Sequence, residues 1–277
     1  MKRGLIIAVS LIIVGIITFV VISKNSPVVN DGFDRVKESL EEETTHEVET
    51  GGEETIKKKD EVPSPFQGID ITSDDSTTVL VNKFNSLSET YEPEDLVFVE
   101  VPTVLENKEV NHLRQIAADS LYDMFGAAKE AGFELYARSG YRSHSTQVQL
   151  FNSYVEVHGE KEANQFSARP GYSEHQTGLV MDITSETVNY DLSEQFGETD
   201  EGKWVQNNAH KFGFIIRYPK GKEEVTGYVY EPWHLRYLGV ELATLLYESE
   251  LTFEEFLEKE GIIDNVKAAA ESEEKTE

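Results

Sequence analysis

The folded part of this chain is organised around the segment Ser173-Glu-His-Gln-Thr-Gly-Leu-Val-Met-Asp182. Its second half belongs to the apolar run Gly178–Ile183, which predicts a short buried strand. Asp182 lies at the end of that run, where an unpaired carboxylate would be costly to desolvate. His175 stands seven residues earlier, so the partner of Asp182 is either a metal ion shared with His175 or a salt bridge. The spacing alone leaves both possibilities open.

Helical and strand-like patterns flank this segment on both sides without a regular βαβ alternation. Apolar residues at helical spacing predict helices at 107–131, 143–157, 200–211, 240–248 and 253–259, the last one capped by Thr252. Alternating or short apolar runs predict strands at 133–137, 178–183 and 214–218, and one or two more within 227–237. The fold class is therefore α+β, a single domain with a small antiparallel sheet flanked by helices.

A second candidate group is Glu231-Pro-Trp-His234. Pro232 makes a helix interior unfavourable and predicts an extended or turn geometry. His234 would add a second imidazole to His175 and Asp182, a set that suits a catalytic zinc ion with an open position for water. Glu231 could then serve as a general base that does not bind the metal. Taken alone, the pair is better explained as a surface acid and a half-buried histidine beside Trp233.

A third candidate group is Ser139-Gly-Tyr-Arg-Ser143. Arg142 follows a glycine-containing turn at the start of a predicted helix. Arginine can bind a carboxylate through two hydrogen bonds or stabilise a developing oxyanion. Gln147 lies five residues later and could bind the same ligand. An arginine at a helix start is commonly just solvated, so its position does not establish a role.

Taken in order, the three segments resemble the VanY-type zinc D-Ala-D-Ala carboxypeptidases, in particular the LdcB-like members that remove D-Ala from tetrapeptides. The resemblance spans most of the predicted domain, beginning near residue 130 and ending near residue 240. The family pattern Ser-x-His-x6-Asp is met by Ser173, His175 and Asp182. The pattern Glu-x-Trp-His is met by Glu231, Trp233 and His234. The pattern Ser-Gly-Tyr-Arg is met by Ser139–Arg142.

The resemblance implies a role for each of these positions. His175, Asp182 and His234 would bind one zinc ion, and Glu231 would act as the general base. The terminal carboxylate or the scissile carbonyl of the substrate would be held by Arg142, Gln147 and Ser173. Glu174, Gln176 and Thr177 are assigned only to the shape of the loop.

The implied reaction is removal of the C-terminal D-alanine from peptidoglycan stem peptides. Cleavage of the L,D bond of a tetrapeptide is slightly favoured over cleavage of the D,D bond of a pentapeptide. Two alternatives stay open: a peptidoglycan endopeptidase of related fold, and a non-catalytic zinc-containing module that binds the wall. An intact Glu231 argues against the second, because zinc binding does not need it.

The N-terminus predicts a membrane anchor. Lys2 and Arg3 precede the apolar run Gly4–Ser23, which is long enough to cross a bilayer as a helix. The basic residues place the N-terminus inside and the rest of the chain outside the cytoplasmic membrane. The run ends without an Ala-x-Ala cleavage site, so we predict an uncleaved anchor at 1–24 and an extracytoplasmic domain on the cell-wall side. Cleavage at this end would instead give a secreted form.

Composition defines the remaining organisation. The acidic segment 25–77 predicts a disordered linker, and 266–277 predicts an acidic tail. Residues 78–265 between them form the predicted domain, which the resemblance implies is a zinc carboxypeptidase domain. Asp and Glu number 52 and Lys and Arg 25 in the 277 residues, a net charge of −27. This charge disfavours nucleic acid as a partner. The absence of cysteine excludes disulfides and thiolate metal sites, which leaves His, Asp and Glu as metal ligands.

Overall fold

The computed structural model describes residues 66, 68–107 and 109–264. Three predicted segments lie wholly or partly outside the described residues. They are the anchor 1–24, the linker at residues 25–65 and 67, and the tail 266–277. Within the described ranges, no helix combines the length and the apolar character that a membrane crossing requires.

The centre of the domain is a four-stranded antiparallel sheet with the strand order β3-β4-β6-β5. These strands are β3 (Tyr136–Ser139), β4 (Val180–Thr184), β5 (Phe214–Tyr218) and β6 (Glu231–Tyr237). A separate two-stranded antiparallel sheet pairs β1 (Leu96–Phe98) with β2 (His112–Arg114). The predicted combination of helices with a small antiparallel sheet is confirmed.

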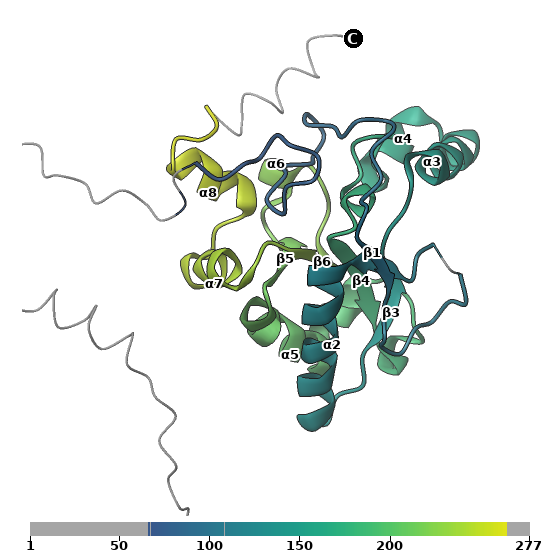
Figure 1. Ribbon diagram of the computed structural model, residues 1–277. Coiled ribbons are helices and arrows are strands. Elements are labelled where there is room, and N and C mark those ends of the chain that lie inside the picture. The colour runs from purple at the N-terminus through teal and green to yellow at the C-terminus, as the bar shows by residue number, and fades with distance from the viewer. Residues whose placement is uncertain (1–65, 67, 108, 265–277) are drawn as a thin grey trace, which may run out of the picture. The chain divides into compact units, whose positions relative to one another are not determined.

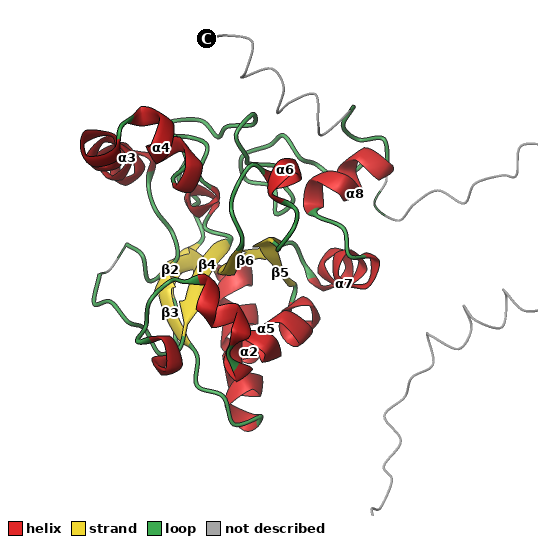
Figure 2. Ribbon diagram, turned by 180° about the vertical axis from the view of Figure 1, so that it is seen from behind, coloured by secondary structure: helices red, strands yellow, loops and turns green. Residues whose placement is uncertain are grey.

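Helices cover both faces of the four-stranded sheet (Figures 1 and 2). On one face lie α2 (Gln115–Glu130) and α5 (Asp200–Asn208). On the opposite side lie α3 (His144–His158), α4 (Glu160–Phe166), α6 (Glu223–Thr226) and α8 (Phe253–Lys259). Beside the edge strand β5 lies α7 (Val240–Ser249).

The two faces of the sheet have different chemistry because successive side chains of a strand point to opposite sides. Met181 and Leu235 are cross-strand partners on β4 and β6, and both are buried in the main core with Leu121 of α2. The next residues along these strands, Asp182 and His234, are also partners and project to the other side. A register shift of one residue would exchange these two sets, so burial of the apolar face fixes the position of the polar one.

A second apolar cluster joins the two ends of the described chain. Phe253 and Phe256 of α8 pack there with Leu242 of α7, and Phe66, Ile69 and Ile71 pack against them. The predicted domain start at residue 78 is therefore too late, because apolar side chains of the assigned linker belong to this cluster.

The predicted helix 107–131 is wrong in its first part. Residues 112–114 form β2, and α2 begins only at Gln115. Val110 and Leu113 are buried, as the helical pattern required, but tertiary hydrogen bonds hold this segment extended. The Arg114 amide donates to the Gly178 carbonyl at 2.8 Å, and the Val99 amide donates to the Asn111 carbonyl at 2.9 Å.

The other predicted elements occur close to their expected positions. The strand 214–218 and the helix 253–259 have the predicted bounds. Thr252 caps the latter in a reciprocal capping box with Glu255. The predicted helix 200–211 is split, because α5 ends at Asn208 and a 3₁₀ turn, η4 (Ala209–Phe212), follows it.

Removal of a core side chain tests the main packing interface. We expect Leu121→Ala, whose parent side chain is fully buried between α2 and the sheet, to lower the free energy of unfolding by about 2–5 kcal/mol. The neighbouring Tyr122→Ala is the matched control, because Tyr122 is 56% exposed and its loss should change stability by about 0.5 kcal/mol or less. Urea denaturation would measure both, and equal effects would contradict this description of the core.

Candidate active site

Three side chains from two separate segments of the sequence meet on the polar face of the sheet. His175 comes from the short 3₁₀ turn η1 (Glu174–Thr177), Asp182 from β4 and His234 from β6. Asp182 Oδ2 lies 3.5 Å from His175 Nε2, and Asp182 Oδ1 lies 3.1 Å from His234 Nδ1. All three side chains are buried, and one ligand atom from each lies within 4.8 Å of the others.

The orientation of His175 is fixed by a backbone carbonyl. Its Nδ1 lies 2.7 Å from the Gly140 carbonyl oxygen, and a carbonyl can only accept, so Nδ1 carries the proton and Nε2 presents a lone pair to the site. Glycine is required at position 140 because a Cβ there would lie 2.6 Å from the His112 carbonyl oxygen, and a larger residue would displace the loop that carries the Gly140 carbonyl. Burial lowers the pKa of His175 to about 3, which keeps the ring neutral, as metal ligation requires.

Asp182 supplies an incompletely satisfied carboxylate. It is 4% exposed, and its buried Oδ1 makes no hydrogen bond with the described residues despite its proximity to His234. Burial alone would raise the pKa of Asp182, but the neighbouring His175, His234 and Arg142 hold that pKa below its usual value. The carboxylate is therefore ionised, and its Oδ1 accepts no hydrogen bond from the described residues although His234 is near, which is the condition that a cation would satisfy.

The spacing of these atoms fits a zinc ion. Zinc bonds of 2.0–2.2 Å to nitrogen and oxygen place neighbouring ligands of a tetrahedron about 3.3–3.5 Å apart. The separations of 3.1 and 3.5 Å across Asp182 are close to this value. Two imidazoles and one carboxylate are three protein ligands, so a fourth position is left for water or substrate.

Glu231 lies on the same side of His234 as Asp182. Its Oε2 is 3.5 Å from His234 Nδ1, and its side chain is 13% exposed. Burial raises the pKa of Glu231 to about 7, and the negative charges of Asp182 and Glu174 add to this increase. A carboxylate with such a pKa can both accept and release a proton near neutral pH.

Arg142 lies next to this centre, where its backbone amide donates to the His175 carbonyl at 3.2 Å, and residues of β3 and α3 hold its side chain. Its Nη1 donates to Gln147 Oε1 at 2.9 Å and its Nη2 donates to Ser139 Oγ at 3.0 Å. Burial lowers the pKa of Arg142, while the charges of Asp182 and Glu231 act against that decrease. A guanidinium has five N–H donors, so two such bonds orient the group and leave capacity for an anionic ligand.

Gln147 and Ser173 are both buried beside these residues. Gln147 Nε2 donates to the Ala168 carbonyl at 2.6 Å and to Ser167 Oγ at 3.4 Å, while its Oε1 accepts from Arg142. Its amide therefore positions Arg142, and direct contact of Gln147 with a substrate stays a prediction. Ser173 immediately precedes η1, and its contact with a substrate likewise stays a prediction.

Comparison with known proteins agrees with this geometry. Residues 110–240 match the family VanY, D-alanyl-D-alanine carboxypeptidase. The protein YodJ of Bacillus subtilis (strain 168) is 50% identical over 190 residues, which are 68% of this chain and 70% of YodJ. The chain belongs to the VanY family. The sequence prediction that this protein belongs to the VanY family is thus confirmed, as is the prediction that it is a carboxypeptidase.

Two solved structures resemble this VanY-family protein along most of its described part. The LdcB LD-carboxypeptidase is 50% identical, with a TM-score of 0.66, and the match covers 67% of this chain and 87% of that one. A mutant of the vancomycin resistance D,D-pentapeptidase VanY from the VanB-type cassette, in complex with Zn(II), is 33% identical with a TM-score of 0.52. That match covers 65% of this chain and 97% of the other. Family membership and the fitted ligand set together support the predicted zinc cofactor.

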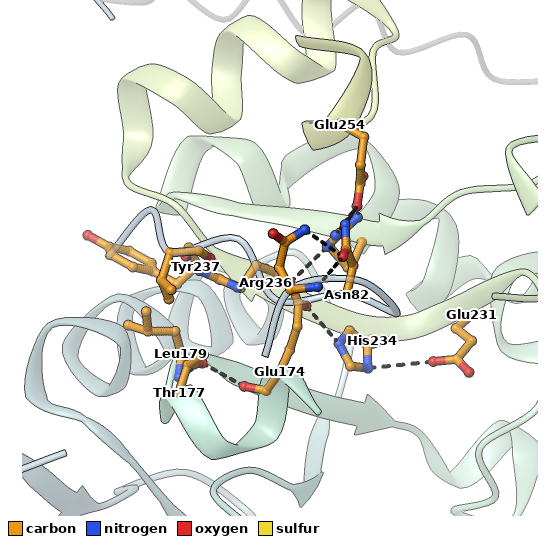
Figure 3. A network of polar contacts seen from close by, with 12 residues as sticks. Asn82, Glu174, Thr177, Leu179, Glu231, His234, Arg236, Tyr237 and Glu254 are labelled. Carbon is orange, nitrogen blue, oxygen red and sulfur yellow. Dashed lines mark hydrogen bonds and ion pairs between the residues drawn. The ribbon is translucent and has the colours of Figure 1, made fainter. Parts of the chain in front are cut away.

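Glu174, which the sequence assigned only to the shape of its loop, has a larger part in the site of this VanY-family protein. Its side chain is fully buried, forms ion pairs with Arg217 and Arg236, and lies next to His234 (Figure 3). A signal for it was present: Arg217 interrupts the apolar strand Phe214–Tyr218, and a buried arginine needs an acidic partner. Nothing in the sequence, however, indicated which of the many carboxylates that partner would be.

Zinc binding by this VanY-family protein should depend on the three buried ligands. We expect His175→Ala to abolish stoichiometric zinc binding at micromolar protein, because two ligands cannot replace the three-ligand centre. His158→Ala is the control, since His158 lies exposed at the end of α3. Metal content after dialysis, measured by plasma mass spectrometry, would check this, and full zinc occupancy in His175→Ala would contradict the assignment.

Proposed function

We propose that this protein is a zinc-dependent L,D-carboxypeptidase that removes the terminal D-alanine from peptidoglycan stem tetrapeptides. The observation that carries the proposal is the placement of Glu231 and Arg142 beside the buried group of His175, Asp182 and His234. A base, a metal site and a carboxylate-binding cation together suit hydrolysis of a terminal peptide bond. The greater similarity to LdcB than to the D,D-pentapeptidase favours the L,D bond.

The protein residues divide the work of hydrolysis. Zinc held by His175, Asp182 and His234 would polarise the scissile carbonyl and make water acidic enough to attack at neutral pH. Glu231 accepts the proton of the attacking water and then donates it to the nitrogen of the leaving D-alanine. Its raised pKa, about 7 from burial, suits both transfers.

Arg142 selects the end of the peptide. Its guanidinium binds the free C-terminal carboxylate of the substrate, which makes the enzyme an exopeptidase. Gln147 and Ser139 fix the orientation of that guanidinium through the hydrogen bonds described above. Ser173, buried where η1 begins, completes the substrate-binding side of the site.

The proposed location is the outer side of the cytoplasmic membrane. The apolar run Gly4–Ser23 after Lys2 and Arg3 would anchor the chain as a single-pass protein with the enzyme domain outside. The acidic segment that follows would allow the domain to reach nearby peptidoglycan. The net charge of −27 disfavours nucleic acid as a partner.

Replacement of the general base tests the reaction directly. We expect Glu231→Gln to lower kcat by about 10²–10⁴-fold on stem tetrapeptide while zinc stays bound. Glu224→Gln is the control, because Glu224 is exposed on α6. The full chain would be incubated with tetrapeptide, pentapeptide or intact peptidoglycan, with and without chelator. Mass spectrometry would follow the loss of one alanine or the release of internal fragments.

Each outcome of that assay has a defined meaning. Chelator-sensitive shortening of the tetrapeptide in preference to the pentapeptide supports the L,D proposal, and the opposite preference replaces it with D,D cleavage. Cleavage only within intact peptidoglycan would indicate an endopeptidase. Zinc binding without cleavage of any substrate would indicate a wall-binding module.

The role of Arg142 predicts a dependence on the free carboxylate. We expect Arg142→Lys, which keeps the charge but loses the planar pair of donors, to lower kcat/KM by about 10–100-fold. The same substitution should have little effect on a tetrapeptide with a C-terminal amide, which the parent enzyme should already cleave poorly. An equal loss on both peptides would mean that Arg142 acts on the reacting carbonyl or on folding, and the unfolding midpoint would separate these two.

A further inference from the structure

His234 is contacted at both ring nitrogens by acidic groups. Nδ1 lies 3.1 Å from Asp182 Oδ1. Figure 3 shows the other two acidic neighbours: Glu231, 3.5 Å from Nδ1, and Glu174, whose Oε2 lies 3.3 Å from Nε2. Asp182 and Glu231 belong to the proposed metal and base side of the site. Glu174 lies on the opposite side of the ring and has no part in the reaction described above.

The carboxylate of Glu174 is fixed in one orientation. Its Oε1 accepts from Arg217 Nε and from Arg236 Nη1, both at 2.8 Å. The side chains of all three residues are 0% exposed. Oε1 is therefore occupied by two guanidinium groups, and Oε2 is the oxygen directed at the imidazole.

This arrangement selects the nitrogen that His234 presents to a metal. A carboxylate only accepts hydrogen bonds, so Nε2 of His234 carries a proton when it faces Glu174 Oε2. Nδ1 also faces carboxylates, those of Asp182 and Glu231. A metal held beside Asp182 would take the place of a proton at Nδ1, so Nδ1 is the nitrogen that would bind it while Nε2 keeps its proton. Carboxylate groups that accept from the second nitrogen of a ligating histidine commonly fix its tautomer and ring orientation and raise its affinity for metal.

We propose that Glu174 is a positioning residue for the metal ligand His234, held in place by Arg217 and Arg236. The inference rests on the zinc centre proposed above, but it assigns a new role to a residue outside the ligand set. Glu174 immediately precedes the ligand His175 in the chain. A single short turn thus supplies one ligand directly and orients another.

The buried charges around Glu174 explain how its carboxylate stays ionised there. Arg217 Nη1 donates to Glu254 Oε2 at 2.8 Å, so two guanidiniums and two carboxylates balance one another. Glu254 belongs to the same network without contacting His234 in the described structure, which makes it a matched control.

Glu174→Gln makes a sharp test because the network controls how the new amide is oriented. Arg217 and Arg236 both donate to the Oε1 position, so the amide oxygen must occupy it and the NH2 group must face His234. The N–H group of His234 Nε2 would then face the NH2 group of the new amide, and two donors cannot form a hydrogen bond with each other. The ring can relieve this only by moving its proton to Nδ1, which is the nitrogen that should bind zinc.

We expect Glu174→Gln to raise the zinc dissociation constant of the full chain by about 10–100-fold. Competition with a chromophoric chelator would measure it with Zn²⁺ alone. Glu254→Gln should lower the stability to urea but leave the zinc dissociation constant close to that of the parent. Glu174→Asp, which keeps the charge at a longer distance, should recover part of the affinity.

Nitrogen NMR of the zinc-loaded parent, labelled at histidine, gives an independent readout. We expect a protonated Nε2 and a zinc-bound Nδ1 at His234. A zinc-bound Nε2 would overturn the proposal. So would unchanged zinc affinity in Glu174→Gln, or an equal loss in Glu254→Gln, which would assign Glu174 to folding alone. Neither measurement uses a peptide, so failure of the carboxypeptidase proposal would not affect the result.

Discussion

Antiparallel pairing of β4 with β6 places Asp182 directly opposite His234, and the rest of the site is built around this pair. The pairing is fixed from the other face, where Met181 and Leu235 pack against α2. Because side chains alternate along a strand, burial of that apolar pair leaves the polar pair one register position away. The position of the candidate metal centre is therefore a consequence of hydrophobic packing, and His175 is added to it by a turn next to β4.

The polar side of the sheet is unusual in carrying several buried charges. Arg217, Arg236, Glu174 and Glu254 form ion pairs away from solvent, an arrangement that contributes little net stability compared with apolar packing. Its value here is orientation. Arg236 also donates to the Thr77 and Val79 carbonyls, and Asn82 donates to Glu254. The same network therefore connects the N-terminal part of the domain and α8 to the strand that carries His234.

Local patterns predicted most elements because they depend on nearby residues. The apolar run of β5 and the capping residue of α8 each specify an element whatever its neighbours are. The exception is instructive: Val110 and Leu113 fit a helix by spacing, yet β2 forms there because the Arg114 amide meets the Gly178 carbonyl, far away in the sequence. Hydrogen bonds between distant segments overrode the local pattern, and no window of sequence contains them.

By itself, the sequence determined the residue types of the site, the α+β class and the family, because the motifs around His175, Asp182, Glu231 and His234 are local and ordered. Only the tertiary structure decided that Glu174 lies behind His234 and that Gln147 is bound to Arg142 and the Ala168 carbonyl. The reason is physical. A residue's type reveals which partners it can accept, whereas the choice among 52 acidic side chains depends on how strands and turns distant in the chain pack together.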